Sequence, residues 1–482
     1  MPCSKAPSDS SSDSSPLSRR STRVCSSVRD CSKSRVFLRA IGGVSARCTK
    51  PRDTSRGAGA GQIGGRSLRP IGTTMAAALA KVERGPARRS RQAMRIQEVR
   101  ERSIPLSRYA GVAAATGGLS TSLVAVLTDI VRDGRRVVGY GHASVGRYAQ
   151  GGLIRERFAP RLLGAPADSL ASDDGSGIDP LRAWDLMMRD EKPGGHGERC
   201  VAVGALDMAL WDAAAKAAGL PLHRFLARRL GLAEDYPQRV PVYAGGGYPY
   251  PHDDLGRLEE ELRRFVDLGY THAKIKIGAA GLDQDRRRID RALRVLGDAS
   301  RLAVDAMNRY DAEGAVDAAK ALAPLGLWWF EDICDPHDFP TQAEVADIYP
   351  GPIGAGEALF SLAEARLLDL YGGLRRERDV LVFDPVHCYG LPGYLAILDH
   401  LCARGWPRAA FRPHAGYLFS LHLVAALRLG WAEATPSAFR PFDDFAGALP
   451  FSSGLAGLPQ SPGIGFERQA TLAGLFRKLL EA

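Results

Sequence analysis

From about Val240 onwards, short apolar runs alternate with amphipathic stretches. The runs are VPVYAG, THAKIKIG, RLAVDAM, LWWFEDI, PIGAGEALF, VLVFDPV, AAFRPHA and WAEATP. Between them, apolar residues recur at helical spacing, first at Leu258, Leu262, Phe265 and Val266, then at Ile289, Leu293 and Leu296. Buried strands that alternate with helices are typical of a parallel sheet covered by helices. Eight such runs predict a closed (β/α) barrel.

A mixed pattern precedes the barrel, from Met94 to about Asp235. The stretches SLVAVLTDIVRD and RRVVGYGHAS flank a turn and predict a β-hairpin. A helical pattern follows from Glu198, with Gly219 as its C-terminal cap. These elements predict an α+β unit, and we expect the turn-rich tail from about Arg440 to return to it.

The chain of 482 residues is long enough for more than one core. Residues 1–93 are rich in Ser, Arg and Gly, show no apolar period and are not expected to fold alone. They hold 19 Lys+Arg against 5 Asp+Glu, so this leader carries +14 and the remaining chain −4. The net charge of +10 therefore does not indicate a nucleic-acid or membrane partner for the folded part. The expected organisation is a leader (1–93), an α+β domain (94–235), a barrel (236–439) and a returning C-terminal segment (440–482).

The leader resembles an organelle transit peptide, but Met94 also reads as the true start of a folded domain, and both interpretations stay open. Its four cysteines lack the spacing of a zinc site, and the other four are scattered as reduced thiols are. The sequence contains no run of 18 apolar residues, so a membrane span is not expected. We expect a cytoplasmic protein, or an organellar one if the leader is a transit peptide.

Charged residues lie near the C-terminal ends of the predicted strands at a nearly constant interval. Successive members are separated by 29, 26, 26, 27 and 30 residues along the series Lys276, Asp305, Glu331, Glu357, Asp384 and His414. In a parallel barrel this register directs all of them to the face where active sites lie. The sequence therefore predicts a catalytic site at this face.

Asp305, Glu331 and Glu357 would bring three carboxylates together, which repel one another unless a cation is bound. Oxygen ligands in this number suit Mg²⁺, with one ion per site. Each acid alone could instead be a solvated residue at a loop end or the partner of a structural arginine. The repeated spacing favours the metal site.

Lys274 and Lys276 flank Ile275, so both ammonium groups lie on one side of the strand. Lysines on an exposed edge strand are the alternative, but the apolar context AKIKIG favours a covered strand. Two like charges near a metal should lower the pKa of each lysine, which suits a general base. On adjacent strands, Asp384 could orient the imidazole of His414 for acid–base work, although a single histidine there could also be a capped turn residue.

The KxK motif, the three acids and the Asp–His pair together resemble the mandelate racemase subgroup of the enolase superfamily, from Met94 to the C-terminus. Within it, the chain is similar to the D-tartrate dehydratase family in TSLVAVLTDIVRDGRRVVGYG, GRYAQGGLIRERFAPRLL, EKPGGHGER and LPQSPGIGFE. The resemblance implies an enolase-type (β/α) barrel, with a capping domain formed by the N-terminal region and the C-terminal tail.

The resemblance also implies roles for individual residues. Lys276 would remove the proton α to a carboxylate, and Lys274 would contact the substrate and neutralise the ene-diolate. The three carboxylates would hold Mg²⁺. His414, oriented by Asp384, would protonate the departing β-hydroxyl and leave an enol that becomes a 2-oxo acid. Lys192, in EKPGGHGER, would reach the distal carboxylate of a tartrate-like substrate, although it could also be a solvated loop lysine.

The chain departs from the family pattern beside these residues, at Val145, Met307, Asn308, Asp332 and Tyr417. We therefore expect a dehydratase of a small hydroxy diacid or acid sugar whose substrate can differ from tartrate. The alternatives are a racemase or epimerase of the same superfamily, and an inactive metal-binding paralogue. The expected partner is a small carboxylate substrate, with no nucleic acid or membrane, in a homo-oligomer.

Overall fold

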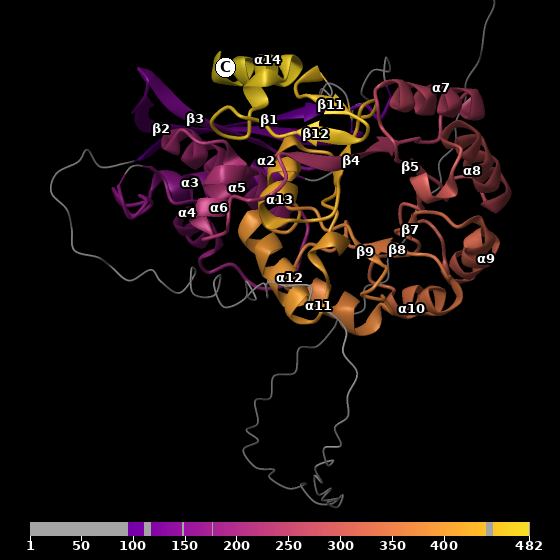
Figure 1. Cartoon of the computed structure of the whole chain (residues 1–482). Coiled ribbons are helices and arrows are strands. Elements are labelled where there is room, and N and C mark those ends of the chain that lie inside the picture. Colours follow the sequence, from indigo (N-terminus) through magenta and orange to yellow (C-terminus); the bar gives the residue numbers. More distant parts are fainter. Residues whose placement is uncertain (1–94, 110–116, 147–148, 176, 440–446, 482) are drawn as a thin grey trace, which may run out of the picture. The chain divides into compact units, whose positions relative to one another are not determined.

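The computed structural model describes residues 95–109, 117–146, 149–175, 177–439 and 447–481 (Figure 1). The predicted leader, 1–93, lies outside these ranges. No helix in them is long and apolar enough to cross a bilayer. The four cysteines in this part of the chain are free thiols, as expected.

Parallel strands form a closed barrel. The strands are β4 (Arg239–Gly246), β5 (Ala273–Lys276), β6 (Leu302–Asp305), β7 (Trp329–Glu331), β8 (Ile353–Ala355), β9 (Val380–Leu381) and β10 (Ala432–Ala434). Each pairs with the next from β4 to β9, and β10 returns to pair with β4. Between β9 and β10, the predicted run AAFRPHA forms an isolated parallel bridge, Leu381 to Phe411, rather than a strand. Pro413 has no N–H to extend that pairing.

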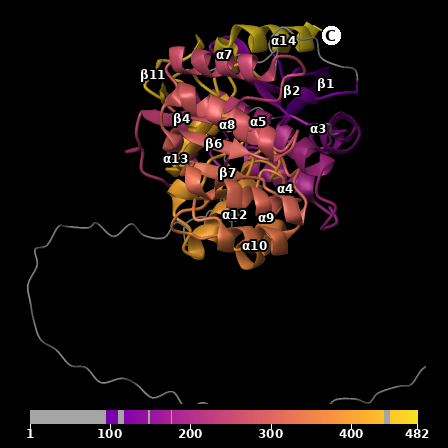
Figure 2. The ribbon, with the colours of Figure 1, turned by 90° about the vertical axis from the view of Figure 1, so that its right-hand side faces the viewer.

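Helices surround the strands (Figure 1). They are α7 (Asp254–Asp267), α8 (Leu282–Leu296), α9 (Ala312–Leu322), α10 (Phe339–Ile348), α11 (Leu362–Tyr371), α12 (Leu391–Ala403) and α13 (Leu418–Leu427). Figure 2 shows α8, α9 and α10 along the outer surface of the barrel. In α7, Leu258, Leu262 and Phe265 are buried as predicted, but Val266 is 45% exposed because it lies at the edge of the apolar face. The barrel prediction is confirmed.

The second unit is an antiparallel sheet with a helical layer. The sheet holds β1 (Ile96–Pro105), β2 (Ser120–Arg132) and β3 (Arg135–His142), and the helices are α2 (Gln150–Leu153), α3 (Ala159–Leu163), α4 (Pro180–Met188), α5 (Glu198–Ala218) and α6 (Leu222–Arg229). The predicted hairpin is β2–β3, and Gly219 caps α5 in the left-handed conformation. Helix α5 packs closely on β3. A Cβ on Gly139 of β3 would lie 2.0 Å from the carbonyl oxygen of Ala209 of α5, so the two backbones approach each other closely at this point.

Two contacts connect the barrel loops and the C-terminal segment to this unit. Gly204 of α5 lies against Val386, in the loop after β9, so closely that a Cβ would lie 2.0 Å from the carbonyl oxygen of Val386. The C-terminal segment contains a small hairpin, β11 (Phe451–Ser452) and β12 (Leu455–Gly457), and helix α14 (Ala470–Glu481). Helix α14 packs on β1 and β2, and Phe476 stacks on Tyr140 with ring centroids 4.4 Å apart. The domain boundaries given above stay a prediction.

Candidate active site

The two lysines of β5 are buried in the barrel interior, as the covered-strand interpretation requires. Lys274 is 0% and Lys276 5% exposed. The Nζ of Lys274 donates to Glu331 Oε1 at 2.5 Å and lies 3.7 Å from Asp305 Oδ2. Lys276 donates to Asp305 Oδ2. Both cations are therefore held by carboxylates of the next two strands.

The three predicted metal ligands lie together. Asp305 ends β6, Glu331 ends β7, and Glu357 follows β8 by two residues. Each offers an oxygen, and these oxygens lie within 4.8 Å of one another. Glu357 Oε2 is buried and lies 3.2 Å from His414 Nε2, and Trp329 Nε1 donates to the second oxygen of Glu331 at 2.5 Å. Three clustered carboxylates fit a hard divalent cation such as Mg²⁺, because like charges this close together need a counter-ion.

The ionisation of these groups reflects their mutual contacts. Burial raises the pKa of Glu331 to about 7, even though Lys274 opposes the shift. Burial alone would lower the pKa of Lys276, but Asp305 and Tyr248 outweigh burial, and the pKa lies well above its ordinary value. The lowered lysine pKa expected from the sequence is therefore wrong for the side chains alone, because each ammonium group contacts a carboxylate. A bound divalent cation would oppose this rise, since it neutralises the same carboxylates.

Asp384 and His414 form the predicted pair. His414 Nδ1 lies 3.0 Å from Asp384 Oδ2, which also accepts a hydrogen bond from Ser144 Oγ at 2.6 Å. The backbone N–H of Val386 donates to the other oxygen at 2.7 Å. Burial alone would lower the pKa of His414, but Glu357 and Asp384 raise it to about 9. The imidazole is therefore a proton donor at neutral pH, and its Nε2 lies 3.2 Å from Glu357 Oε2.

A cavity of about 180 Å³ joins the two halves of the site. The residues that line it include Lys276, Glu357, His387, His414, Tyr248, Arg108, Val145, Met307 and Asn308. Three departures from the family pattern, at 145, 307 and 308, therefore lie in its wall. Lys192 is exposed and is not among the lining residues, so the structure does not bring it to the cavity, and its substrate-binding role stays a prediction.

The other two departures lie beside the site. Asp332 is buried and accepts a hydrogen bond from Asn308 Nδ2 at 2.9 Å. Tyr417 is buried, and its ring meets that of His142 edge-on, with centroids 4.9 Å apart. The residues that distinguish this chain thus shape the walls around the proton-transfer and metal groups.

Sequence reasoning missed four residues at the site. Glu433 of β10 is buried, lies 3.5 Å from Lys274 and accepts the backbone N–H of Ala415 at 3.0 Å. It follows His414 by only 19 residues, outside the interval that identified the other acids. His387 stacks beside His414, with centroids 6.1 Å apart. Arg108 and Tyr248 lie in loops, where no period identifies them.

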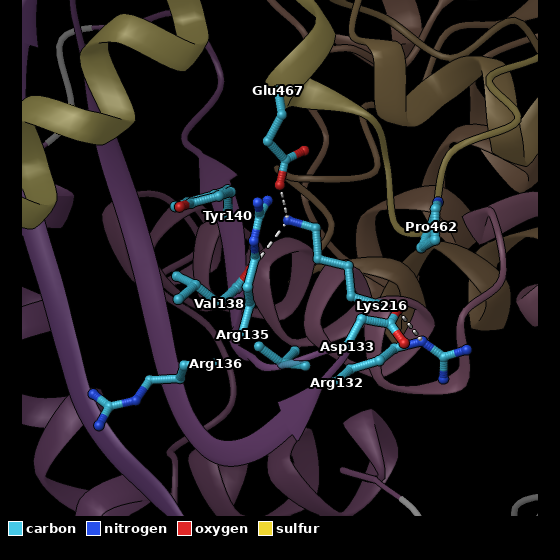
Figure 3. A pocket seen from close by; sticks show the side chains of 10 residues that line it. Arg132, Asp133, Arg135, Arg136, Val138, Tyr140, Lys216, Pro462 and Glu467 are labelled. Carbon is cyan, nitrogen blue, oxygen red and sulfur yellow. Dashed lines mark hydrogen bonds and ion pairs between the residues drawn. The ribbon is translucent and has the colours of Figure 1, made fainter.

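A larger cavity, of about 570 Å³, lies away from this site, at the end of the β2–β3 hairpin. Figure 3 shows the ammonium group of Lys216 directed at Glu467 there. Lys216 also pairs with the buried Asp212 at 2.6 Å and donates to the carbonyl oxygen of Val138 at 3.0 Å. Its charge is therefore neutralised within the protein.

The smaller cavity places a lysine beside a cluster of three carboxylates and a carboxylate-oriented histidine, at the strand ends of a capped (β/α) barrel. This combination is the architecture of the enolase superfamily. Residues 107–227 match the family model described as mandelate racemase / muconate lactonizing enzyme, N-terminal domain, and residues 257–471 match the one described as enolase C-terminal domain-like. The chain belongs to the mandelate racemase and muconate lactonizing enzyme group of the enolase superfamily.

Known proteins agree with this assignment. An arabinonate dehydratase of Saccharolobus solfataricus is 27% identical over 59% of this chain and 74% of its own length. The L-talarate/galactarate dehydratase of Salmonella typhimurium is 29% identical over 65% of this chain and 73% of its own. The crystal structure of a racemase from Streptomyces coelicolor A3(2) with bound magnesium matches with a TM-score of 0.60 and 25% identity, over 78% of this chain and 99% of that one.

Proposed function

We propose that this protein is a Mg²⁺-dependent dehydratase of a hydroxy acid, a hydro-lyase that converts a small hydroxy diacid or acid sugar to a 2-oxo acid. The observation that carries the proposal is the placement of Lys276 and His414 on one cavity, each held by its own carboxylate. Dehydration needs a base for the α-proton and an acid for the β-hydroxyl. Relatives named as dehydratases of arabinonate and of talarate and galactarate support the same reaction class.

The three carboxylates, Asp305, Glu331 and Glu357, hold the metal in this proposal, and their oxygens lie close enough for one ion. When bound, Mg²⁺ supplies a positive charge that binds the substrate carboxylate and stabilises the charge developed when the α-proton leaves. Lys274 adds a second positive charge beside these carboxylates, because its ammonium group lies 3.7 Å from Asp305.

Lys276 is the base, and the Nζ atom takes the α-proton. In the structure, Asp305 accepts a hydrogen bond from this ammonium group and so stabilises its protonated form. Lys276 can act as a base toward substrate only when the Asp305 carboxylate is bound to another partner, which removes that stabilisation. His414 is the acid. Its proton moves to the departing hydroxyl, and Asp384 stabilises the imidazolium until then. Water leaves, and the enol product tautomerises to the 2-oxo acid.

Racemisation or epimerisation is the second candidate, and the observation that favours it is that Lys276 and His414 face the same cavity. Two such groups could exchange one α-proton without loss of a hydroxyl. A solved neighbour is itself named as a racemase. An inactive paralogue is disfavoured, because the sequence retains all six residues of the predicted proton-transfer and metal set.

The test is a panel of acid sugars and hydroxy diacids, tartrate among them, incubated with the protein and Mg²⁺. We expect formation of a 2-oxo acid, detected with semicarbazide, from at least one member. In deuterated buffer, an epimerase would instead return substrate with deuterium at the α-carbon and inverted configuration, without any 2-oxo acid. That outcome would replace the dehydratase proposal by the second candidate.

A further inference from the structure

Arg108 enters the catalytic cavity from the loop that follows β1, and its neighbours hold this loop to the barrel on one side and to the residue before β2 on the other. The hydroxyl of Tyr109 donates to the carbonyl oxygen of Pro249 at 2.5 Å, and its ring packs on Tyr250 with centroids 4.9 Å apart. On the other side, the buried Leu106 donates its backbone N–H to the carbonyl oxygen of Leu119 at 2.8 Å. Arg108 lies between these two anchors, so its position over the barrel loop is determined by the fold.

The guanidinium of Arg108 lies over the ring of Tyr248, 5.1 Å from the centroid. Its Nε is buried and has no hydrogen-bond partner among the residues that the structure describes. The other cations of the cavity are occupied: Lys276 pairs with Asp305, and His414 pairs with Asp384. Within the described ranges, Arg108 makes no ion pair. A buried donor without an acceptor is costly, so this group is suited to a ligand that brings the acceptor.

The chemistry of that ligand follows from the guanidinium. Arginine donates two parallel N–H groups to a planar carboxylate, which it prefers to a hydroxyl. Lys276, which we assign to the reacting end of the cavity, lies 5.5 Å from the centroid of the same Tyr248 ring. Both cations therefore lie beside one ring and line one cavity, so a short molecule whose α-carbon is beside Lys276 can extend towards Arg108.

We propose that Arg108 binds the second carboxylate of the substrate, so that the enzyme selects hydroxy diacids over the corresponding monoacids. This inference rests on the proposed function, since it assigns the opposite end of the same cavity. It differs from the resemblance to the tartrate dehydratases, which places Lys192 in this role. Lys192 is exposed and lines no part of the cavity, whereas Arg108 already lies in its wall.

The test compares diacids with monoacids that differ only at the terminal carboxylate: tartrate with threonate, and galactarate with galactonate. Binding to the Mg²⁺-loaded protein is measured by calorimetry and turnover by 2-oxo acid formation. We expect Arg108→Ala to lower kcat/KM and affinity for the preferred diacid by roughly 10²-fold. The loss for monoacids should be clearly smaller, because they bring no second carboxylate to the guanidinium. Arg108→Gln, closer in size, is the second variant, and Arg102→Ala, an exposed arginine of β1, is the matched control.

Each outcome decides the inference. Equal losses for diacids and monoacids would show a structural role for Arg108 and overturn the inference, as would a wild-type preference for monoacids or failure to bind either diacid. A diacid-specific loss in Lys192→Ala, with Arg108→Ala unaffected, would return the role to Lys192. Diacid binding that depends on Arg108 without any 2-oxo acid would uphold this subsite and refute the proposed dehydration.

Discussion

Gly204 of helix α5 packs against the loop that carries Asp384, and its replacement tests how strictly that loop must be placed. A Cβ at residue 204 would lie 2.0 Å from the carbonyl oxygen of Val386, where real Cβ contacts essentially never fall under 3.0 Å. Gly204→Ala must therefore separate the helix and the loop by about 1 Å. Overpacking of this kind costs about 1–3 kcal/mol. Alanine has a higher helix propensity than glycine, which stabilises the variant by about 1 kcal/mol. The free energy of unfolding should therefore fall by up to about 2 kcal/mol.

The functional effect should exceed the loss of stability, because Asp384 lies two residues from Val386 and orients His414. A misplacement of about 1 Å can cost about 10²-fold in rate. The assay is the melting temperature together with kcat. Gly474→Ala in α14 is the matched control: no atom lies within 4 Å of the added Cβ, so the same exchange should raise stability by up to about 1 kcal/mol. If Gly204→Ala is as stable and as active as this control, the contact does not position the loop.

Two further predictions concern the metal and the buried histidines. EDTA should abolish activity and added Mg²⁺ should restore it, and activity that survives exhaustive chelation would contradict the metal site. Mg²⁺ should also raise the melting temperature, and this rise should be smaller in Glu331→Gln. Burial lowers the pKa of His223 to about 4 and that of His422 to about 3. The unfolded chain therefore binds more protons below about pH 6.5, so the melting temperature should fall from there towards pH 4. A flat profile would contradict neutral histidines in the core.

The barrel was predictable because its signal is periodic. Each strand-like run is buried on both faces, and the acids recur at the length of one strand–helix unit, which is why the sequence alone predicts that Asp305, Glu331 and Glu357 lie together. Where the period fails, the prediction fails. Glu433 was missed because its interval is shorter. The run around Phe411 keeps the interval but forms only a bridge, because Pro413 has no N–H to extend the pairing.

The rest of the site depends on loops and on contacts across the two units. The approach of Arg108 to Tyr248 joins residues that are far apart in the chain, and no local pattern reports it. The raised pKa of Lys276 could not be predicted either, since it depends on the contact of Nζ with Asp305 rather than on the neighbouring Lys274 alone. Sequence identified the groups to which we assign the chemistry, and three-dimensional contacts determine their charge and the cavity beside them.

The central claim is the division of labour between Lys276 and His414, and α-proton exchange in deuterated buffer tests it most directly. Lys276→Ala should lose both 2-oxo acid formation and deuterium uptake at the α-carbon, because the variant lacks the base that takes that proton. His414→Asn removes only the acid, worth roughly 10²–10⁴-fold in rate, so product formation should fall while deuterium uptake continues. Uptake that survives in Lys276→Ala and disappears in His414→Asn would show that the base and the acid are reversed.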